Sequence, residues 1–368
     1  MKSTRFPKTR AVARVDLGAL RRNYRLLERL AGGAEVMAVV KANAYGHGLS
    51  SILPTLLAAG CRRFAVATLE EGVALRSLCE GCEILILGYT PPTEAAALVR
   101  HRLTQTVFSA PYAVALSECL GGERLPVHLK IDGGMCRLGF PADDPAALTA
   151  VLRQRSLSVV GIYTHFPSPD TAPLATRAAF AAFLACRALL EADGRRLLAH
   201  AAASPTLALF PEFALDAVRV GLSLYGISPT GQDLGLSPVL SLHAPIVQIH
   251  EAPIGRPVGY GGDFVTARPS RIGTLPIGYA DGFPRAMRGF PLTLCHGAAT
   301  YTVRTAGRIC MDQMMLDLTD TPAQVGDEVC LWRSAVAPAR HLGTIPYEVL
   351  SALSPRVTRL TTSEKEKP

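Results

Sequence analysis

Short apolar runs alternate with amphipathic segments along the first two thirds of the chain. Segments such as 48–60, 69–80, 91–102 and 172–194 carry apolar residues at helical spacing. A repeated strand-then-helix pattern predicts parallel strands, because each helix returns the chain to the same end of the sheet. Eight such alternations favour an α/β fold that closes into a (β/α)8 barrel of the TIM type. The runs predicted as strands are residues 35–40, 63–67, 83–87, 104–108, 126–131, 158–163, 197–201 and 217–221.

The pattern changes near Gly235. Short apolar runs punctuated by Gly and Pro follow at 238–253, 270–282, 291–297, 301–320 and 326–332. One helix candidate, 344–354, stands among them, and the series as a whole is typical of a mostly β domain. The predicted division is a barrel over residues 12–235 and a C-terminal β domain over residues 236–368, with residues 1–11 packing on the β domain.

Composition and charge narrow the class of protein. Of the 368 residues, 49% are hydrophobic and 18% are charged, which suits an ordered protein with two cores. The net charge is +8, but the basic residues are scattered over predicted helix faces, so no nucleic-acid-binding stripe is indicated. A moderate positive charge favours anionic small ligands. No apolar run reaches membrane-spanning length, and the basic N-terminus lacks the apolar segment of a signal peptide, so a cytoplasmic protein is expected.

The nine cysteines are irregularly spaced, which predicts free thiols. Cys79 and Cys82 form a CxxC pair, for which a redox role is an alternative. A metal site would need a second pair or histidines at ligand spacing, and the sequence offers neither. No metal is therefore predicted.

Polar and charged residues lie at the ends of several predicted strands. In a (β/α)8 barrel the C-terminal ends of the strands meet at one mouth, where catalytic groups gather. Lys41 follows the first predicted strand, and a lysine there either reaches solvent or serves as an amine whose pKa is lowered by burial. The other polar or charged residues at strand ends are Lys130 and Arg137 at and beyond the end of the fifth strand, His165 after the sixth, Ser204 after the seventh, and Arg219 and Gly221 in the eighth. Together with Lys41 they describe a basic pocket suited to an anionic ligand.

The loops after the seventh and eighth strands are a common place for phosphate in such barrels. Here they offer the Ser204 hydroxyl and the backbone N–H groups around Gly221 and Leu222, although a simple turn would also explain Gly221. A lysine together with a phosphate cradle suggests pyridoxal 5'-phosphate, held covalently by Lys41 and serving as an electron sink.

Seven segments in the two predicted domains resemble the alanine racemase family, in the same order along the chain. They are AVVKANAYGHG (38–48), KIDGGMCRLGF (130–140), YTHF (163–166), HAAAS (200–204), VRVGLSLYG (218–226), LPIGYADGFPR (275–285) and GRICMDQMM (307–315). The resemblance implies an isomerase that uses pyridoxal phosphate to interconvert L-alanine and D-alanine, with peptidoglycan precursors as one use of the D-alanine. It also implies a homodimer whose active sites are shared between subunits.

The resemblance further implies two bases, one for each face of the substrate. Lys41 would bind the cofactor and act on D-alanine, and Tyr279 would reach the other subunit's site and act on L-alanine. A tyrosine ordinarily has a pKa of about 10, so nearby cations must favour its ionised form. The residues implied for that task are His165, His200 and Arg219, of which Arg219 would also face the pyridine nitrogen of the cofactor. Tyr279 alone would also fit an interface aromatic, and His200 alone a buried core histidine.

The remaining implied roles concern the substrate and the phosphate. Arg137 would contact the phenolic oxygen of the cofactor and the substrate carboxylate. Lys130 matches a lysine that is often carbamylated in the family, which would remove a like-charge clash beside Arg137. Met311, with Asp312 beside it, would bind the substrate carboxylate from the partner subunit. The phosphate would be held by Tyr45, Ser204, Gly221 and Leu222, with Thr361 at the position of a family tyrosine.

Four positions depart from the family pattern. Thr358 and Thr361 stand where the family segment Arg-Val-Pro-Arg-x-Tyr has its Pro and its Tyr, Ala203 stands where Asn is common, and Gly133 where Thr is common. A threonine at 361 widens the pocket and keeps a hydroxyl, so turnover of serine beside alanine is a hypothesis. Three alternatives stay open: a serine or broad-specificity racemase, a barrel-type decarboxylase, and a non-catalytic protein that binds pyridoxal phosphate or maintains its supply.

Overall fold

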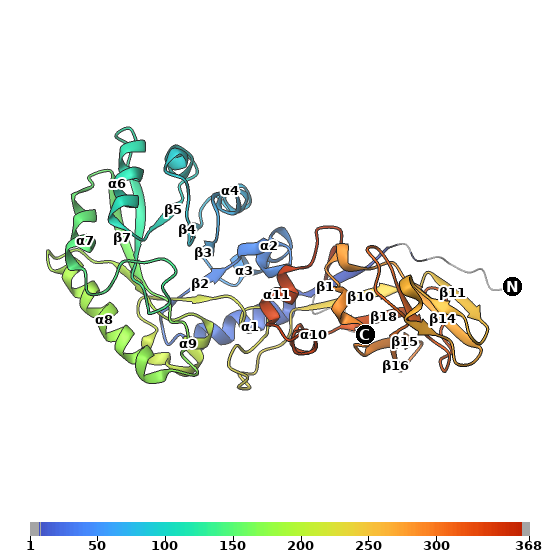
Figure 1. Cartoon of the computed structure of the whole chain (residues 1–368). Coiled ribbons are helices and arrows are strands. Elements are labelled where there is room, and N and C mark those ends of the chain that lie inside the picture. The colour runs from blue at the N-terminus through green and yellow to red at the C-terminus, as the bar shows by residue number, and fades with distance from the viewer. Residues whose placement is uncertain (1–6, 8, 363–368) are drawn as a thin grey trace. The chain divides into compact units, whose positions relative to one another are not determined.

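The computed structural model describes residues 7 and 9–362, which form two compact units (Figure 1). The barrel unit consists of residues 20–44 and 52–237. The β unit contains residues 238–362, the segment Tyr45–Ser51 and the described residues before Leu20.

This division differs from the predicted one in two places. The first strand of the chain and the segment Tyr45–Ser51 both belong to the β unit, although the predicted barrel covered residues 12–235. The expected packing of residues 1–11 on the β domain concerns mainly residues 1–6 and 8, which lie outside the described residues.

Eight parallel strands form the sheet of the barrel unit, in the order β8-β7-β6-β5-β4-β3-β2-β9. The ring is nearly closed, because the Arg219 N–H donates to the Ala202 carbonyl (2.9 Å) and residues 203 and 219 form a bridge just beyond β8. The predicted (β/α)8 architecture is confirmed, and each predicted run overlaps one strand. The strands are β2 (Glu35–Val39), β3 (Arg63–Val66), β4 (Glu83–Ile86), β5 (Thr104–Val107), β6 (Leu125–Lys130), β7 (Leu157–Tyr163), β8 (Leu198–His200) and β9 (Ala217–Val220).

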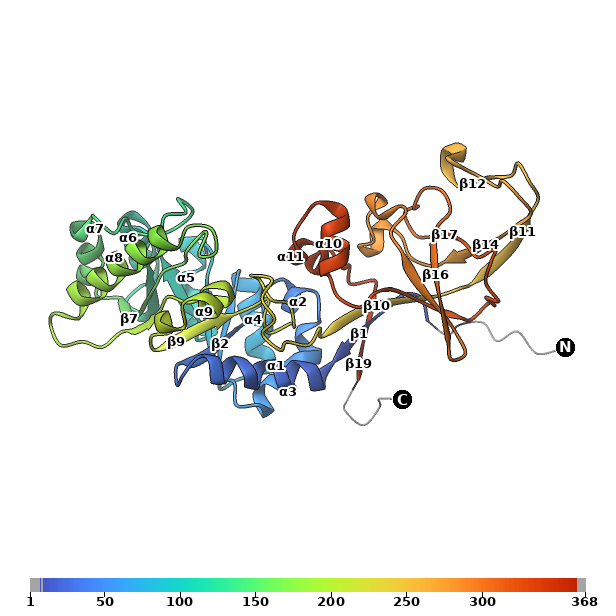
Figure 2. The same cartoon turned by 90° about the horizontal axis from the view of Figure 1, so that it is seen from below.

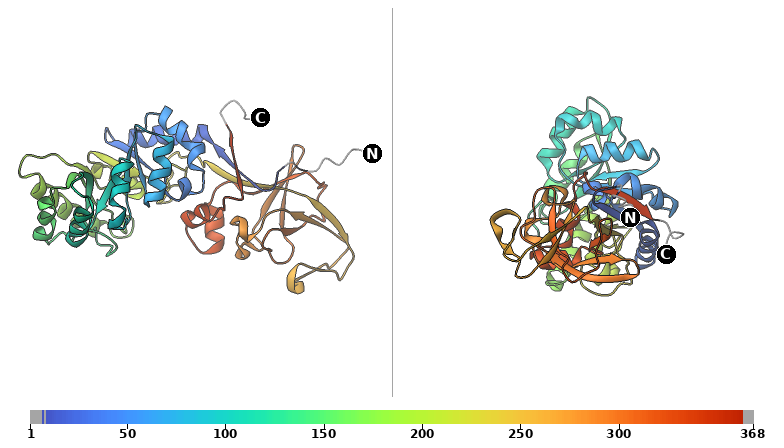
Figure 3. Two further views of the ribbon diagram at one scale, coloured as in Figure 1. Left: turned by 90° about the horizontal axis from the view of Figure 1, so that it is seen from above. Right: turned by 90° about the vertical axis from the view of Figure 1, so that its right-hand side faces the viewer.

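Helices surround these strands on the outside (Figure 3). Four of them begin at a side chain that caps the first turn: Asp16, Thr68, Ser109 and Asp144 accept hydrogen bonds from backbone N–H groups three residues further on. The helices are α1 (Leu17–Leu30), α3 (Leu49–Ala58), α4 (Leu69–Leu78), α5 (Ala95–Arg100), α6 (Ala110–Cys119), α7 (Pro145–Ala150), α8 (Pro173–Glu191) and α9 (Ser204–Leu209), with 3-10 turns at Pro92–Glu94, Val151–Arg153 and Pro211–Phe213.

Helix α8 is long and apolar enough, by length and composition alone, to cross a membrane. The expectation that no apolar run reaches that length is therefore wrong. The side chains of Phe183 and Leu190 on this helix are buried, and Arg177 and Arg187 make ion pairs with residues outside it, to Glu212 (2.9 Å) and Asp216 (3.0 Å). A core helix of a soluble protein can pass the same test of length and composition, so this one helix is weak evidence of a membrane span.

The β unit is built on a nine-stranded sheet in the order β11-β14-β17-β16-β15-β18-β10-β1-β19 (Figure 2). The first strand, β1 (Val12–Asp16), pairs antiparallel with β10 and parallel with β19, so the sheet joins both ends of the described chain. The other strands are β10 (Leu240–Pro245), β11 (Gln248–Ala252), β14 (Ser270–Leu275), β15 (Leu292–His296), β16 (Ala299–Thr305), β17 (Met314–Asp317), β18 (Glu328–Trp332) and β19 (Thr358–Thr362). A separate hairpin, β12 (Pro257–Val258) with β13 (Phe264–Val265), and two helices, α10 (Val336–Leu342) and α11 (Pro346–Ser351), complete the unit.

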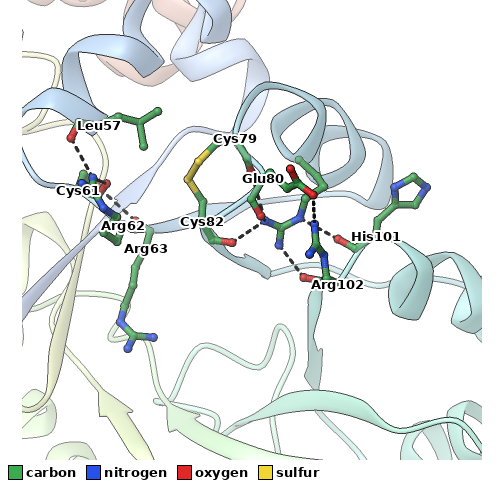
Figure 4. The surroundings of a disulfide bond; sticks show 10 residues. Leu57, Cys61, Arg62, Arg63, Cys79, Glu80, Cys82, His101 and Arg102 are labelled. Carbon is green, nitrogen blue, oxygen red and sulfur yellow. Dashed lines mark hydrogen bonds and ion pairs between the residues drawn. A yellow bond between two sulfur atoms is a disulfide. The ribbon is translucent and has the colours of Figure 1, made fainter.

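Cys79 and Cys82 are joined by a disulfide (Figure 4), so the expectation of free thiols is wrong for this pair. The other seven of the nine cysteines are free. The bond closes the turn from α4 to β4, at the end of the barrel strands opposite to the end that Lys41 follows. Arg76 holds the same turn, since its guanidinium donates to the carbonyls of Cys79 (3.2 Å) and Cys82 (2.7 Å). The disulfide is therefore part of the α4–β4 connection.

Candidate active site

The chain turns in a left-handed sense directly after the end of β2. Ala42, Asn43, Ala44 and Tyr45, within α2 (Lys41–Tyr45), have φ between 51° and 56°, a backbone region that residues with a Cβ rarely adopt. Each such residue costs roughly 1–2 kcal/mol relative to the right-handed form, so surrounding contacts must hold the turn. Strain of this kind gathers at functional sites. The side-chain pattern carries no signal for this conformation, which the sequence therefore did not predict.

Arg219 is the centre of a buried polar network in the barrel unit. Its side chain is only 4% exposed. Nη1 donates to Nδ1 of His200 (2.7 Å) and to the His200 carbonyl (2.7 Å), while Nη2 donates to the Thr164 carbonyl (2.6 Å). Nε has no acceptor within the described part of the chain, so it is available to a ligand.

This network fixes the protonation of two histidines. A guanidinium only donates hydrogen bonds, so Nδ1 of His200 must accept and the proton of this ring lies on Nε2. Nε2 lies 2.8 Å from Nδ1 of His128, which accepts in turn. Burial, with the positive charge of Arg219 added, lowers the pKa of His128 to about 3 and that of His200 well below its usual value. Both rings are therefore neutral in the folded protein, and His200 is a buried histidine bonded to Arg219.

Tyr163 forms the aromatic floor of the network. The His200 ring stacks on it with 4.8 Å between centroids, and the Arg219 guanidinium carbon lies 4.9 Å from its centroid. The Lys130 ammonium lies 5.8 Å away, within range of a cation–π interaction. Sequence reasoning named neither Tyr163 nor His128. The signal was available, because each lies two residues before a predicted site residue, and side chains alternate faces along a strand.

Lys41, Lys130, Arg137 and His165 interact electrostatically with one another. Burial first, and then the charge of Arg137, lowers the pKa of Lys41. Burial and the charges of Arg137, Arg219 and Lys41 lower the pKa of Lys130 to about 8, against the opposing charge of the nearby Asp132. Burial and the same group of cations lower the pKa of His165 to about 3. Each positive charge raises the free energy of the other charged groups nearby, so an anion bound among them would relieve the repulsion.

Arg137 is carried by a closed loop after β6. A bridge between Ile131 and Phe140 closes the base of the loop, and the Asp132 carboxylate accepts from the N–H groups of residues 135 (3.1 Å) and 136 (3.2 Å). A Cβ at Gly133 would overlap the carbonyl oxygen of His165. Because of this close approach, only glycine fits at position 133 without a shift of the backbone around His165.

Ser204 and Gly221 form a cradle for an anion. The Gly221 N–H donates to the Ser204 hydroxyl (3.1 Å), which joins the start of α9 to the end of β9. The N–H groups of Leu222 and Ser223 have no acceptor among residues 7 and 9–362. Ala203 has the extended backbone of an N-cap residue, but its side chain cannot accept a hydrogen bond, whereas the asparagine common in the family could.

In the β unit, Tyr279 and Met311 are held side by side. The Tyr279 N–H donates to the Cys310 carbonyl (3.1 Å), and the Ala280 N–H donates to the Met311 carbonyl (3.0 Å). A Cβ at Gly278 would overlap both of these carbonyls, so the two segments can approach this closely only with glycine there. Tyr279 is 42% exposed and Met311 is 53% exposed, so both are accessible on this unit.

Asp281 anchors the turn that carries this tyrosine. Its buried carboxylate accepts from the Gly278 N–H (3.0 Å) and makes ion pairs with Arg10 (3.3 Å) and Arg356 (3.3 Å). Arg356 also pairs with Asp312 (2.6 Å). Sequence reasoning named Asp312 but neither Asp281 nor Arg356, although Arg356 opens the segment that was compared with the family's Arg-Val-Pro-Arg-x-Tyr.

The last two predicted phosphate residues, Tyr45 and Thr361, also belong to the β unit. The buried Tyr45 ring lies 5.8 Å from that of Tyr347, and the Arg359 Nε donates to the carbonyl of Gly46 (2.9 Å). Thr361 is exposed on β19, beside β1. A cleft of about 910 Å³ in the same unit is lined by Met311 and Asp312, among others.

The chain matches two family models over nearly its whole length. Residues 15–229 match the alanine racemase N-terminal domain and residues 239–361 match the alanine racemase C-terminal domain. The chain belongs to the alanine racemase family. Among its relatives, the alanine racemase of Desulfovibrio desulfuricans is 39% identical over 362 residues, which cover 95% of this chain and 97% of the relative.

Solved structures of alanine racemases share the fold of this family member. That of Bacillus anthracis with bound L-Ala-P has a TM-score of 0.90 and 30% identity, covering 98% of this chain and 97% of that one. The Bartonella henselae enzyme with covalently bound pyridoxal phosphate has a TM-score of 0.85 and 30% identity, covering 96% of this chain and all of that one (100%).

The described residues of this alanine racemase family member fit pyridoxal phosphate. The unpaired N–H groups of Leu222 and Ser223, beside the Ser204 hydroxyl, suit a phosphate. The Arg219 Nε suits a hydrogen-bond acceptor such as a ring nitrogen, and the clustered cations suit an anion. No group of three or more His, Cys, Asp or Glu side chains that could hold a metal ion occurs within the described ranges.

Proposed function

We propose that this chain interconverts L-alanine and D-alanine with pyridoxal phosphate, with Lys41 and the partner's Tyr279 as the two bases. The observation that carries the proposal is the combination, in a barrel of this family, of Lys41, the Arg219 network and the Ser204 cradle at the ends of the strands. The relatives with bound L-Ala-P and with bound pyridoxal phosphate support the same substrate and cofactor.

The barrel residues bind and orient the cofactor. When bound, pyridoxal phosphate draws electrons from the Cα of the amino acid joined to it, which acidifies the α-proton. Lys41 would hold the cofactor covalently through Nζ, and the Ser204 hydroxyl and the Leu222 N–H would receive its phosphate. Arg219 would face the pyridine nitrogen. Burial lowers the pKa of Arg219 to about 10, so at neutral pH it keeps its proton and gives a hydrogen bond only.

The two bases work on opposite faces of the substrate, because one group cannot reach both sides of the same Cα. Lys41 takes or returns the proton on the D-alanine face, and its lowered pKa increases the fraction of neutral amine. Tyr279 of the partner subunit moves the proton on the L-alanine face. Arg219 supplies the positive charge that supports this step, and His165 and His200, which are neutral, contribute hydrogen-bonding groups.

The substrate carboxylate is bound by Arg137 and by the Met311 N–H of the partner subunit, with Asp312 of the partner subunit beside it. The Met311 N–H has no acceptor within the described residues of the chain, and the Met311 side chain is exposed. Arg137 offers the planar donor pair that suits a carboxylate.

Lys130 is carbamylated in the active protein. Its lowered pKa of about 8 leaves part of the amine neutral near physiological pH. The neutral amine attacks carbon dioxide, an N–C bond forms, one proton leaves, and a cation among cations becomes an anion. With 13C-labelled bicarbonate, wild type should show a carbamate carbon signal by NMR that Lys130→Gln lacks. Wild type without the signal would contradict the assignment.

The active form is a homodimer with shared sites, and it supplies D-alanine in the cytoplasm, with peptidoglycan precursors as one use. The accessibility of Tyr279 and Met311 on the β unit supports their use by a second copy.

The comparisons do not favour the alternatives of a serine racemase or a non-catalytic binding protein, since the relatives are named alanine racemases. Thr361 stands at the family's tyrosine position, so serine belongs in the same assay as a measure of specificity.

Exchange of the α-proton in heavy water, followed by NMR, tests the proposal. Wild type with pyridoxal phosphate should exchange the α-proton of L-alanine and D-alanine and form the opposite enantiomer. Tyr279→Phe should keep the bound cofactor and lose at least about a hundredfold in conversion, whereas Tyr301→Phe in the same unit should behave as wild type. A wild-type protein that binds the cofactor but exchanges no proton would show a carrier rather than a racemase.

A further inference from the structure

Glu71 connects the ends of two barrel strands. It lies in the first turn of α4, where its own N–H donates to the Thr68 hydroxyl (3.3 Å). One carboxylate oxygen accepts from the N–H of Ala42 (2.6 Å), and the other accepts from the N–H of Ala67 (2.7 Å). Ala42 follows Lys41, and Ala67 follows β3. The Glu71 carboxylate therefore accepts backbone hydrogen bonds from both segments just beyond the point where the pairing of β2 with β3 ends.

Backbone hydrogen bonds hold the residues on both sides of Lys41. On its N-terminal side, the Val40 N–H donates to the Ala65 carbonyl (2.9 Å), the last backbone bond between the ends of these two strands. On its C-terminal side, the Ala42 N–H donates to Glu71. Ala42 is also the first of the four left-handed residues, so Glu71 holds the start of the strained turn. The direction in which Lys41 leaves the backbone depends on both bonds.

We propose that Glu71 is a positioning residue for Lys41: it holds the left-handed turn and thereby aims the amine. The inference rests on the proposed role of Lys41 as cofactor lysine and base. Glu71 itself touches backbone only, so it is not a catalytic residue.

The charge of Glu71 gives this role a measurable signature. Lys41 faces Arg137 from the loop after β6, Lys130 from β6, His165 from the loop after β7, and Glu71 from α4. Burial and Arg137 lower the pKa of Lys41, and the negative charge of Glu71 opposes them. Removing that charge should lower the pKa of Lys41 further, so the acid limb of its pH profile should move to lower pH.

The test uses the full-length enzyme with its cofactor and the variants Glu71→Gln and Glu71→Asp. Glutamine cannot accept from both N–H groups, and aspartate is too short to reach both. Glu70→Gln is the matched control, because Glu70 lies in the same turn of α4 and is exposed. In each protein we would measure hydrogen exchange over residues 40–45 and 65–68, cofactor trapped on Lys41 by borohydride, and α-proton exchange of each alanine enantiomer against pH.

The expected result is faster hydrogen exchange in both segments and a loss of about tenfold to a hundredfold in proton exchange at D-alanine, the Lys41 face. The acid limb of that profile should shift to lower pH in Glu71→Gln, which loses the negative charge, but much less in Glu71→Asp, which keeps it, and Glu70→Gln should match wild type. Glu71 variants that match Glu70→Gln in the pH profile and in cofactor trapping would overturn the proposal. If one Glu71 variant does not fold, the same measurements on the other Glu71 variant test the proposal.

Failure of the proposed function would be recognised separately. It would appear as wild type that exchanges no proton, and hydrogen exchange and cofactor trapping would then still decide the role of Glu71.

Discussion

The His128 ring lies so close to β7 that only glycine fits opposite it. An ideal Cβ at Gly161 would lie about 2.5 Å from the ring atoms of His128. Gly161→Ala should therefore displace the ring, break its 2.8 Å bond to His200 and loosen the His200–Arg219 contact. We expect kcat for alanine racemisation to fall about tenfold, with the protein still folded and the cofactor bound.

The control for this substitution is Val160→Ala, which changes a 40% exposed neighbour on the same strand. Steady-state kinetics in both directions, with the absorbance of the bound cofactor, give the comparison. If Gly161→Ala and Val160→Ala had the same kcat, the His128–His200 contact would have no part in the reaction.

The neutral, buried state of His128 and His200 makes stability depend on pH. In the folded protein the pKa of both histidines lies far below the ordinary value of about 6.5. Below pH 6.5 these histidines are therefore protonated in the unfolded chain but not in the folded protein. Stability must then fall as the pH falls. When the pH is lowered from about 7.5 to about 5.5, each of the two histidines should lower the free energy of unfolding by about 1 kcal/mol.

Urea unfolding at the two pH values measures this cost. His128→Asn should reduce the pH dependence by about 1 kcal/mol relative to wild type. Equal pH dependence in His128→Asn and wild type would show that this ring does not stay neutral in the fold.

Among the elements, the Cys79–Cys82 disulfide lies at the end of β4 that is opposite to the site. Replacing both cysteines with alanine frees a short loop in the unfolded chain, so the free energy of unfolding should fall by up to about 2 kcal/mol. The retained Arg76 bonds to the carbonyls of this turn should keep its path. Thermal unfolding and kcat check the result, and a large loss of kcat without loss of stability would place the disulfide in the function.

The elements that the sequence predicted are those with local signals. The barrel strands were found because each is a short apolar run beside an amphipathic helix, and the site residues at their ends followed from the barrel geometry. β1 was missed as part of the β sheet because its partners, β10 and β19, are more than 200 residues away in the sequence. The left-handed turn after Lys41 was missed because Ala and Asn give no sign of positive φ in a row.

At the scale of the whole molecule, the resemblance of seven segments was enough to expect the family, and the two family matches confirm it. What the sequence could not show is how each half of the site is held. Glu71 holds the Lys41 turn in the barrel unit, and Asp281 with Arg356 holds the Tyr279 turn in the β unit. These contacts join residues far apart in the sequence, with no periodic pattern to reveal them.

The central claim is that one site uses Lys41 of one subunit and Tyr279 of the partner subunit, and mixing two inactive variants tests it most directly. Lys41→Ala and Tyr279→Phe would be unfolded together, refolded with pyridoxal phosphate and assayed for alanine racemisation. Half of the dimers should be mixed, and each mixed dimer should hold one intact site, so activity should return to about a quarter of that of wild type. If the mixture stays as inactive as each variant alone, although mixed dimers form, the two bases do not come from different subunits.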